Sequence, residues 1–389
     1  MLAISQTGSG KTLMFLLPLL QRLSDDAAPC SALVLAPTSA LATQHATVAK
    51  KLASADQRLS VDCLVDSSVS DVAAASDRRL VVTTPASVLA LTKQPSGLEA
   101  LRIAGIGAIA IDEVDACLCG GEFEEGLSRD GEAVLDALEQ VARVRSGQRG
   151  DGGASSLQYV LTTAHLSKTH ETALSERFPR AVRVGQRSGG AASGAGTLVP
   201  TLRQAFHYFR GDRRAKLISL LRREKGAPSW RTDGTTLLFC ADARAAQAVH
   251  SALATATAPQ LPTPPGGSSK ASEPASPLLP DALLLHEEQT ASERDAALAE
   301  FGRCATQRLL VCSTVMARGL DLPHVAHVVM YDMPAETASY VHCVGRTARA
   351  GREGRVSCLV ESNAEQQRYR HLHALQRAAQ LRFESTSED

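Results

Sequence analysis

Residues 5–12 read Ser5-Gln6-Thr7-Gly8-Ser9-Gly10-Lys11-Thr12, and this stretch decides the fold. An apolar segment, predicted to be a helix over 12–23, follows it directly. Small residues let backbone N–H groups turn toward phosphate oxygens, and the start of a helix adds the positive end of its dipole. The stretch therefore predicts a nucleotide-binding loop, in which Lys11 reaches the β- and γ-phosphates and the Thr12 hydroxyl holds Mg²⁺.

The loop departs from the generic phosphate-binding pattern at one position. That pattern has glycine five residues before Gly10, where this chain has Ser5. A flexible turn without a ligand is therefore the alternative interpretation of residues 8–12. The step from glycine-rich loop to apolar helix favours phosphate binding.

A second chemical feature is an apolar strand that ends in acidic residues. Residues 109–111 read Ile-Ala-Ile and are followed by Asp112-Glu113-Val114-Asp115. At the carboxyl edge of a parallel sheet, Asp112 is expected to hold Mg²⁺ through water and Glu113 to polarise the attacking water. The alternative is that these acidic residues only cap the next helix.

The chain alternates between short strands and helices, which predicts an α/β fold with parallel sheets. Runs that are apolar throughout suit strands covered on both faces. Predicted strands lie at 32–36, 80–83, 108–111, 158–162, 236–240, 282–285, 308–312 and 325–331. Predicted helices lie at 12–23, 40–52, 131–144, 243–255 and 291–301.

The length of 389 residues is enough for two domains. The glycine-rich residues 185–200 are predicted to be the linker, which gives one domain over 1–184 and another over 201–389. The Pro-Ser-rich residues 258–280 are predicted to be a disordered insertion in the second domain.

Composition excludes several classes of protein. The 41 basic and 41 acidic residues cancel, which is not the balance of a protein that coats nucleic acid non-specifically. The nine cysteines contain no CxxC pair for zinc, and they indicate a reducing compartment inside the cell. Neither a signal peptide nor a membrane span is predicted.

Two arginines in the second half form a third feature. Arg346 and Arg349 are three residues apart, so on a helical turn they would project from one face. Two guanidinium groups suit the growing charge of a γ-phosphate, whereas a solvated basic helix face is the alternative. Together with the loop and the acidic strand end, the pair predicts a bipartite ATP site.

The order of these motifs resembles the DEAD-box RNA helicases over essentially the whole chain. Residues 6–12 resemble motif I, and Asp112–Asp115 is the family tetrad with valine in place of alanine. The other matching stretches are 37–44, Thr84-Pro85, 163–165, 237–240, 313–321 and 342–351. The resemblance implies two RecA-like domains, each with a mostly parallel sheet flanked by helices and joined by a flexible linker.

The resemblance also implies roles for individual residues. Residues 6–12 would bind ATP, Asp321 would face its ribose, and Lys11, Asp112, Glu113, Arg346 and Arg349 would be catalytic. Residues along the RNA backbone would be Pro37, Thr38, Thr84, Pro85, Arg294 and Gly319. Residues that couple ATP to strand separation would be Asp115, Thr163, His165 and His342. Contacts of this kind track phosphate and sugar, so little sequence specificity is expected.

Several positions depart from the family pattern. Ser39 and Ala40 replace arginine and glutamate, His165 replaces threonine, and Cys343 replaces arginine. The residues of the chemistry match better than those of coupling, so ATP binding is predicted more firmly than unwinding. The segment that reads adenine in this family does not precede residue 5, which predicts a fragment or a truncated product. The Asp-Glu-Val-Asp variant is similar to an organellar branch of plant-type members, so a chloroplast location is one expectation.

Three hypotheses about function remain open at this point. The first is an RNA-dependent ATPase and helicase that uses ATP and Mg²⁺, acts as a monomer and works with accessory proteins. The second is a catalytically weak RNA-binding scaffold that keeps the fold. The third is a DNA-directed motor of the same superfamily, because backbone contacts to single strands look alike.

Overall fold

The structure is a computed structural model, and it divides into two compact units. It describes residues 1–5, 9–25, 31–65, 79–94, 106–119, 127–148, 157–164, 166–185, 201–226, 235–255, 282–303, 308–317, 322, 325–334, 337–349, 351–361 and 383–385. Most of the predicted linker and the whole predicted insertion lie outside these residues. Among the described residues, no helix combines the length and the hydropathy that a bilayer span requires.

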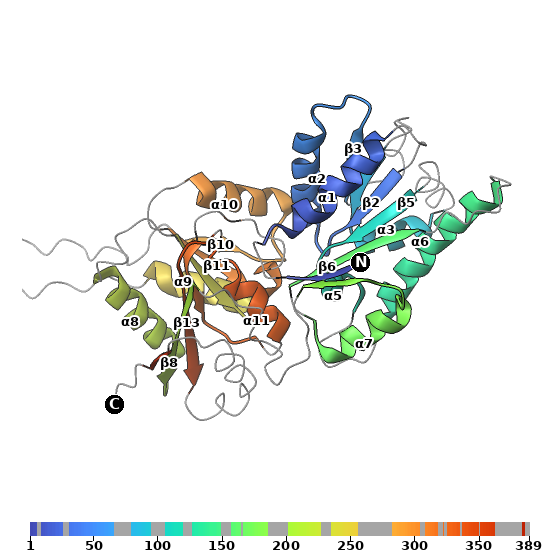
Figure 1. Cartoon of the computed structure of the whole chain (residues 1–389). Helices are drawn as coiled ribbons and strands as arrows, with labels where there is room; N and C mark the ends of the chain where they lie inside the picture. The colour runs from blue at the N-terminus through green and yellow to red at the C-terminus, as the bar shows by residue number, and fades with distance from the viewer. Residues whose placement is uncertain are drawn as a thin grey trace, which may run out of the picture. The chain divides into compact units, whose positions relative to one another are not determined.

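The first unit is one parallel sheet of seven strands in the order β3-β4-β2-β5-β6-β1-β7 (Figure 1). Its strands are β1 (Leu2–Ile4), β2 (Ser31–Leu35), β3 (Ser60–Leu64), β4 (Arg79–Thr83), β5 (Ile106–Ile111), β6 (Gln158–Thr163) and β7 (Arg183–Gly185). Its helices are α1 (Lys11–Ser24), α2 (Ser39–Ala53), α3 (Pro85–Thr92), α5 (Val114–Leu118), α6 (Arg129–Gln148) and α7 (Lys168–Arg177).

Helices cover both faces of this sheet. Leu33 and Leu35 of β2 pack into one apolar core with α3, α5, α6 and α7, whereas Ala32 and Val34 pack into another with α1 and α2. Successive side chains of a strand point to opposite faces, so a strand buried on both sides must be apolar throughout. That requirement explains why β5 and, after Ser31, β2 are continuous apolar runs.

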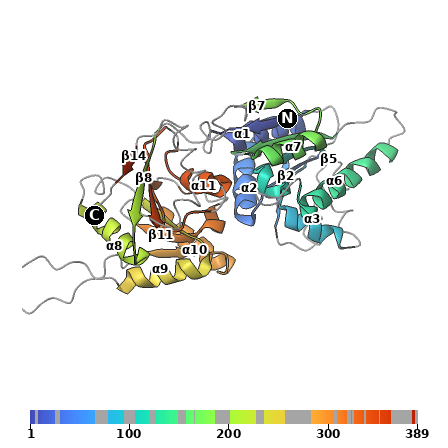
Figure 2. The ribbon, with the colours of Figure 1, turned by 90° about the horizontal axis from the view of Figure 1, so that it is seen from below.

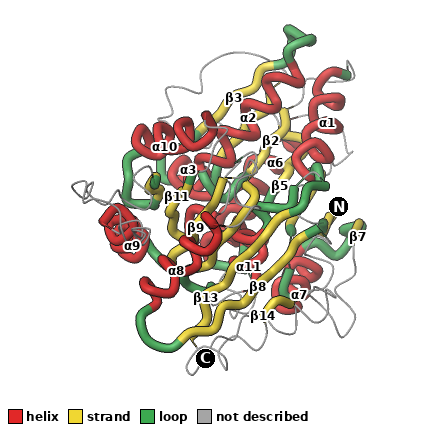
Figure 3. The backbone as a smooth tube through the Cα atoms, turned by 90° about the vertical axis from the view of Figure 1, so that its left-hand side faces the viewer, coloured by secondary structure: helices red, strands yellow, loops and turns green. Residues whose placement is uncertain are grey.

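The second unit repeats this architecture with the order β10-β11-β9-β12-β13-β8-β14. Its strands are β8 (Leu202–Phe209), β9 (Thr235–Cys240), β10 (Leu283–Leu285), β11 (Leu309–Ser313), β12 (Val325–Met330), β13 (Gly354–Glu361) and β14 (Phe383–Ser385). Its helices are α8 (Arg213–Gly226), α9 (Ala243–Thr255), α10 (Ala291–Arg303), the 3₁₀ helix η3 (Thr314–Ala317) and α11 (Thr337–Val344). Figure 2 shows α8 and α9 side by side and away from α11, and Figure 3 shows β8 between β13 and β14.

The predicted fold class is confirmed, and every predicted strand and helix is present. The predicted start of the linker is wrong, because Gly185 belongs to β7, where it pairs with Ile4 of β1. Gly185 has a φ of 112°, and a Cβ there would lie 2.0 Å from the Ile4 carbonyl oxygen. Only glycine tolerates this backbone conformation together with so close a contact. Gly185, predicted to be part of the flexible linker, is therefore needed for the pairing of the edge strand β7 with β1.

Candidate active site

The strand order of the first unit brings three chemically distinct segments to one sheet edge. β6 lies between β5 and β1, and all three strands are parallel. Their carboxyl ends therefore meet at the same edge, where parallel sheets bind ligands. The loop after β1 leads to Lys11, the residues after β5 begin at Asp112, and β6 itself ends at Thr163.

The described part of the loop after β1 is tied together by hydrogen bonds at the start of α1. Gly10 precedes α1 with a φ of 87°, and a Cβ there would meet no atom within 4 Å. Lys11 is the first residue of α1, and its Nζ donates a 2.7 Å hydrogen bond to the Ser5 carbonyl oxygen. The Ser5 and Ser9 hydroxyls are 2.9 Å apart, so the serine that departs from the generic pattern links the two sides of the loop. Gln6, Thr7 and Gly8 lie outside the described residues.

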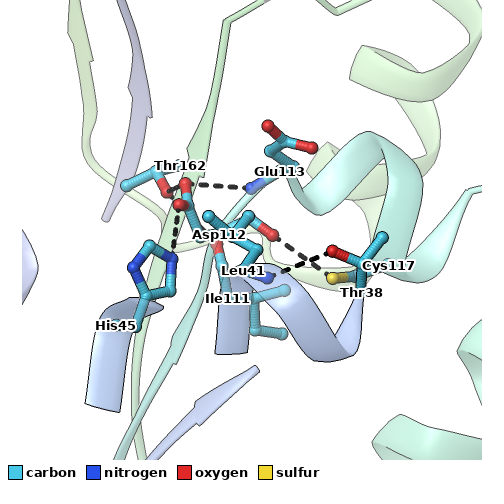
Figure 4. Close-up of polar contacts among 8 residues, drawn as sticks. All are labelled: Thr38, Leu41, His45, Ile111, Asp112, Glu113, Cys117 and Thr162. Atoms are coloured by element: carbon cyan, nitrogen blue, oxygen red, sulfur yellow. Dashed lines mark hydrogen bonds and ion pairs between the residues drawn. The ribbon is translucent and has the colours of Figure 1, made fainter. Parts of the chain in front are cut away.

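Asp112 is buried, and its carboxylate accepts three hydrogen bonds (Figure 4). Its Oδ2 is 2.9 Å from His45 Nε2, and its Oδ1 accepts from the Thr162 hydroxyl at 2.6 Å and from the Glu113 backbone N–H at 3.0 Å. Burial raises the pKa of Asp112, but the hydrogen bonds from His45 and Thr162 and the charges of His45 and Lys11 outweigh it and lower that pKa. The carboxylate is therefore ionised at neutral pH, and Lys11 belongs to its electrostatic surroundings.

Glu113 has an unusual backbone conformation for its residue type. It precedes α5 with a φ of 47°, in the left-handed region, and its side chain makes no capping hydrogen bond to the helix. Within the described part of the chain, the one backbone N–H that the Asp112 carboxylate binds is that of Glu113, which precedes the helix. Helix capping alone therefore does not account for Asp112, whose carboxylate also binds His45 and Thr162. A non-glycine residue in the left-handed region costs roughly 1–2 kcal/mol and is common at functional sites.

A hydrogen bond joins the acidic segment to the end of β6. The Thr163 hydroxyl donates to Asp115 Oδ1 over 2.7 Å, and both residues are buried. Thr162, the preceding residue, binds Asp112. Two successive threonines of β6 thus bind two carboxylates of the acidic segment, while His165 lies outside the described residues.

The predicted arginine pair of the second unit does not lie on a helix face. α11 ends at Val344, and Arg346 and Arg349 follow it in tight turns. Arg346 Nε donates to the His342 carbonyl oxygen at 3.0 Å, and Arg349 Nε donates to the Gly345 carbonyl oxygen at 2.9 Å. Arg346 is only 6% exposed and His342 is fully buried, so a solvated basic face is wrong for Arg346.

The residues predicted to follow the RNA backbone lie mainly at helix starts. Thr38 caps α2 by accepting from the Leu41 backbone N–H, and Thr84 caps α3 by accepting from the Ser87 backbone N–H. Pro37 precedes the first cap, and Pro85 is the first residue of α3. Arg294 in α10 donates to the carbonyl oxygens of Gln289 and Glu287. Gly319 and Asp321 lie outside the described residues.

The donor set fits Mg²⁺ better than a metal that needs several protein ligands. Among the described residues, no group of three or more His, Cys, Asp or Glu side chains could hold a metal ion. Mg²⁺ is usually held by one or two carboxylates together with phosphates and waters, because it gives up its waters reluctantly. An ionised Asp112 and the Thr12 hydroxyl at the start of α1 supply oxygen donors of that kind.

Two functional candidates, His45 and Thr162, are absent from the sequence-based prediction. A signal for His45 exists: the buried face of α2 otherwise consists of Leu41, Ala42, Ala46, Ala49 and Ala53. A histidine in an apolar stripe needs a polar partner, but the pattern does not say which one.

Comparisons with known proteins identify the relatives of this chain. The family DEAD/DEAH box helicase matches residues 1–177, and the family Helicase conserved C-terminal domain matches residues 279–351. The chain is 30% identical to the ATP-dependent RNA helicase dbp8 of Aspergillus terreus, covering 92% of this chain and 62% of that protein. It is also 30% identical to dbp8 of Aspergillus oryzae, covering 92% of this chain and 71% of that protein.

A solved structure shares the fold. S. cerevisiae Dbp5 bound to RNA and ADP BeF3 has a TM-score of 0.71 and 21% identity, covering 99% of this chain and 84% of that one. The chain spans about three fifths of the length of the first relatives it matches. The expected RecA-like architecture and family resemblance are thereby confirmed, while the similarity to a plant organellar branch stays a prediction. This chain belongs to the DEAD-box helicase family.

Proposed function

We propose that the chain is an ATP-dependent RNA helicase that binds RNA and locally separates short duplexes. The observation that carries the proposal is the meeting of Lys11, Asp112 and Glu113 at one sheet edge. The family and the named relatives support it.

In the first unit, Lys11 would bind the β- and γ-phosphates, and the loop residues from Gln6 to Gly10 would surround them with backbone N–H groups. Asp112 and Thr12 would hold Mg²⁺, which, when bound, neutralises charge on the phosphates. Glu113 would orient and polarise the attacking water. The left-handed backbone of Glu113 supports this role, because it places the side chain outside the capping arrangement of α5.

In the second unit, we assign to Arg346 and Arg349 the stabilisation of charge on the γ-phosphate during hydrolysis. The burial of Arg346 supports this assignment, because a guanidinium away from solvent interacts strongly with an anion. Asp321 is proposed to face the ribose. Asp115, Thr163, His165 and His342 are proposed to couple the nucleotide to strand separation, and the Thr163–Asp115 hydrogen bond supports that for its two members.

RNA is the proposed partner, held mainly by its backbone near Pro37, Thr38, Thr84, Pro85, Arg294 and Gly319. Dbp5, a protein of the same fold, has been solved with RNA and a nucleotide analogue. Action as a monomer, help from accessory proteins and an intracellular location are further parts of the proposal. The named relatives give no support for a chloroplast location.

Steady-state ATP hydrolysis by the purified chain, with and without single-stranded RNA, tests the proposal. Turnover should rise with RNA, and Glu113→Gln should abolish it while ATP binding remains. DNA of equal length should stimulate less than RNA, whereas equal stimulation would favour a DNA-directed motor. Absence of turnover with RNA binding intact would favour a non-catalytic scaffold.

Arg349→Ala tests the second unit separately. It should slow hydrolysis by roughly 10³-fold or more, as loss of an arginine finger does in related chemistry. A change in melting temperature with unaltered turnover would remove Arg349 from this role.

A further inference from the structure

His45 is a buried polar residue that the proposed mechanism does not use. It lies in the middle of α2, it is fully buried, and its ring forms a T-shaped pair with Phe15 of α1, with 5.4 Å between ring centroids. Its Nε2 is 2.9 Å from Asp112 Oδ2, across 67 residues of sequence (Figure 4). His45 therefore contacts Asp112, the proposed magnesium ligand, from α2. The other two donors to this carboxylate, Thr162 and Glu113, do not belong to α2.

The direction of this hydrogen bond follows from the chemistry of its two partners. An ionised carboxylate only accepts, so the proton between the groups sits on His45 Nε2. The other ring nitrogen, Nδ1, is buried and has no partner among the described residues. His45 thus has a single polar interaction within that part of the chain, and it is the one with Asp112.

His45 binds the one carboxylate oxygen of Asp112 that accepts a single hydrogen bond. An ionised carboxylate offers about four lone-pair sites. Thr162 and the Glu113 backbone N–H occupy Oδ1, while His45 alone binds Oδ2. About one acceptor site therefore remains, on Oδ2, and the imidazole fixes where it points.

We propose that His45 is a positioning residue for the magnesium–nucleotide complex, acting through Asp112. It holds the carboxylate so that the remaining lone pair of Oδ2 faces a water of the ion. The inference rests on the proposed function, since it requires that Asp112 binds Mg²⁺. Groups that bind metal-holding carboxylates typically change metal affinity by about 10- to 100-fold when removed. The competing interpretation is a core histidine that uses a nearby carboxylate only for its own hydrogen bond.

Three variants separate these interpretations. His45→Leu removes the donor and keeps an apolar side chain of similar reach. His45→Gln restores an N–H donor at the end of the side chain. His327→Leu is the matched control, because His327 is also buried and its Nε2 lies 2.9 Å from the Ser357 hydroxyl in the second unit. None of the proposed metal residues belongs to that unit.

The measurement is equilibrium binding of a fluorescent ADP analogue to the full chain as Mg²⁺ is titrated, with RNA affinity and melting temperature as parallel readouts. His45→Leu should raise the Mg²⁺ concentration at half-saturation by about 10- to 100-fold and leave metal-free ADP binding unchanged. His45→Gln should recover most of the loss. His327→Leu should lower the melting temperature without moving the Mg²⁺ titration.

An unchanged Mg²⁺ titration in His45→Leu, or an equal shift in His327→Leu, would overturn the inference and leave the proposed function standing. If the unaltered chain bound nucleotide with no dependence on Mg²⁺, the proposed function would fail and the inference with it. If His45→Leu does not fold, His45→Gln and His45→Asn decide. Only the glutamine is long enough to reach Asp112, so equal Mg²⁺ titrations in these two variants would overturn the inference.

Discussion

The two units have the same strand order, yet the charged residues at the corresponding sheet edge make different contacts in each. Each strand from β8 to β14 takes the place that the strand numbered seven lower takes in the first unit. In the first unit, residues 5–10 connect β1 to a helix that starts with Lys11. In the second, only residues 210–212 connect β8 to a helix that starts with Arg213.

The acidic residues after the corresponding strands differ in the same way. Arg213 Nη1 lies 2.6 Å from Asp332 Oδ1 after β12, and its guanidinium lies over the rings of Phe209 and Tyr331. In the first unit, Asp112 instead binds uncharged or imidazole donors, and Lys11 binds a backbone oxygen. One edge thus carries an ion pair of its own, while at the other edge we propose that the cation and the carboxylate bind a ligand. Identical topology therefore does not imply identical function.

The largest expected effect comes from removing the cation on the ligand-binding side. Lys11→Ala should reduce ATP hydrolysis by about 10²- to 10³-fold, the usual loss when a charge-stabilising donor is removed. Arg213→Ala, at the equivalent helix start, should leave hydrolysis within a few-fold of the unaltered chain. Steady-state assays of both variants make the comparison. Similar losses in the two variants would mean that the second sheet edge also serves the nucleotide.

Stability should respond in the reverse order. Arg213→Ala should lower the free energy of unfolding by about 2–3 kcal/mol, because a partly buried ion pair and two ring contacts are lost together. Urea unfolding measures the change, and a double-mutant cycle with Asp332→Asn isolates the pair. A coupling energy near zero in that cycle would show that the Arg213–Asp332 ion pair does not stabilise this edge of the sheet.

The ends of the equivalent strands β6 and β13 give a smaller contrast. Thr163→Val should cost about 1–2 kcal/mol, because Asp115 loses a buried hydrogen bond. Glu361→Gln, at the last residue of β13, should cost less than about 0.5 kcal/mol, because Glu361 is 47% exposed and lies 3.9 Å from Arg213. If both substitutions lowered the free energy of unfolding in urea equally, the end of β6 would not differ from the end of β13 in belonging to a buried hydrogen-bond network.

The smallest expected effect concerns a helix start and pH. The Thr290 backbone N–H and hydroxyl bind Glu293 and lower its pKa, whereas Thr38 caps α2 without an acidic residue in the first turn. A lowered pKa stabilises the fold at pH values above the ordinary glutamate range, and this contribution is lost as pH falls through the lowered pKa. Glu293→Gln should therefore lower the melting temperature slightly at pH 7 and not at pH 2.5. An equal decrease at both pH values would exclude the ionised carboxylate as the cause.

Sequence reasoning succeeded where a signal is local. The apolar runs in β2 and β9 are recognisable without any partner, and β5 ends directly before Asp112, as predicted. It missed β8, whose buried and less buried residues largely alternate, the half-buried β3, the long strand β13, and the three-residue strands β1, β7 and β14. It also placed Arg346 and Arg349 on a helix, because spacing alone cannot show that α11 ends at Val344.

The sequence by itself determined which groups are available: a phosphate loop, an acidic strand end, paired arginines and enough apolar runs for two parallel sheets. These properties depend on neighbouring residues, so short patterns are sufficient to encode them. Only the tertiary structure decided which groups meet. Thr162 binds Asp112 across 50 residues, His45 binds it across 67, and Arg213 binds Asp332 across 119. Such pairs depend on strand order and on which helix covers which face, and both are set by packing of the whole sheet.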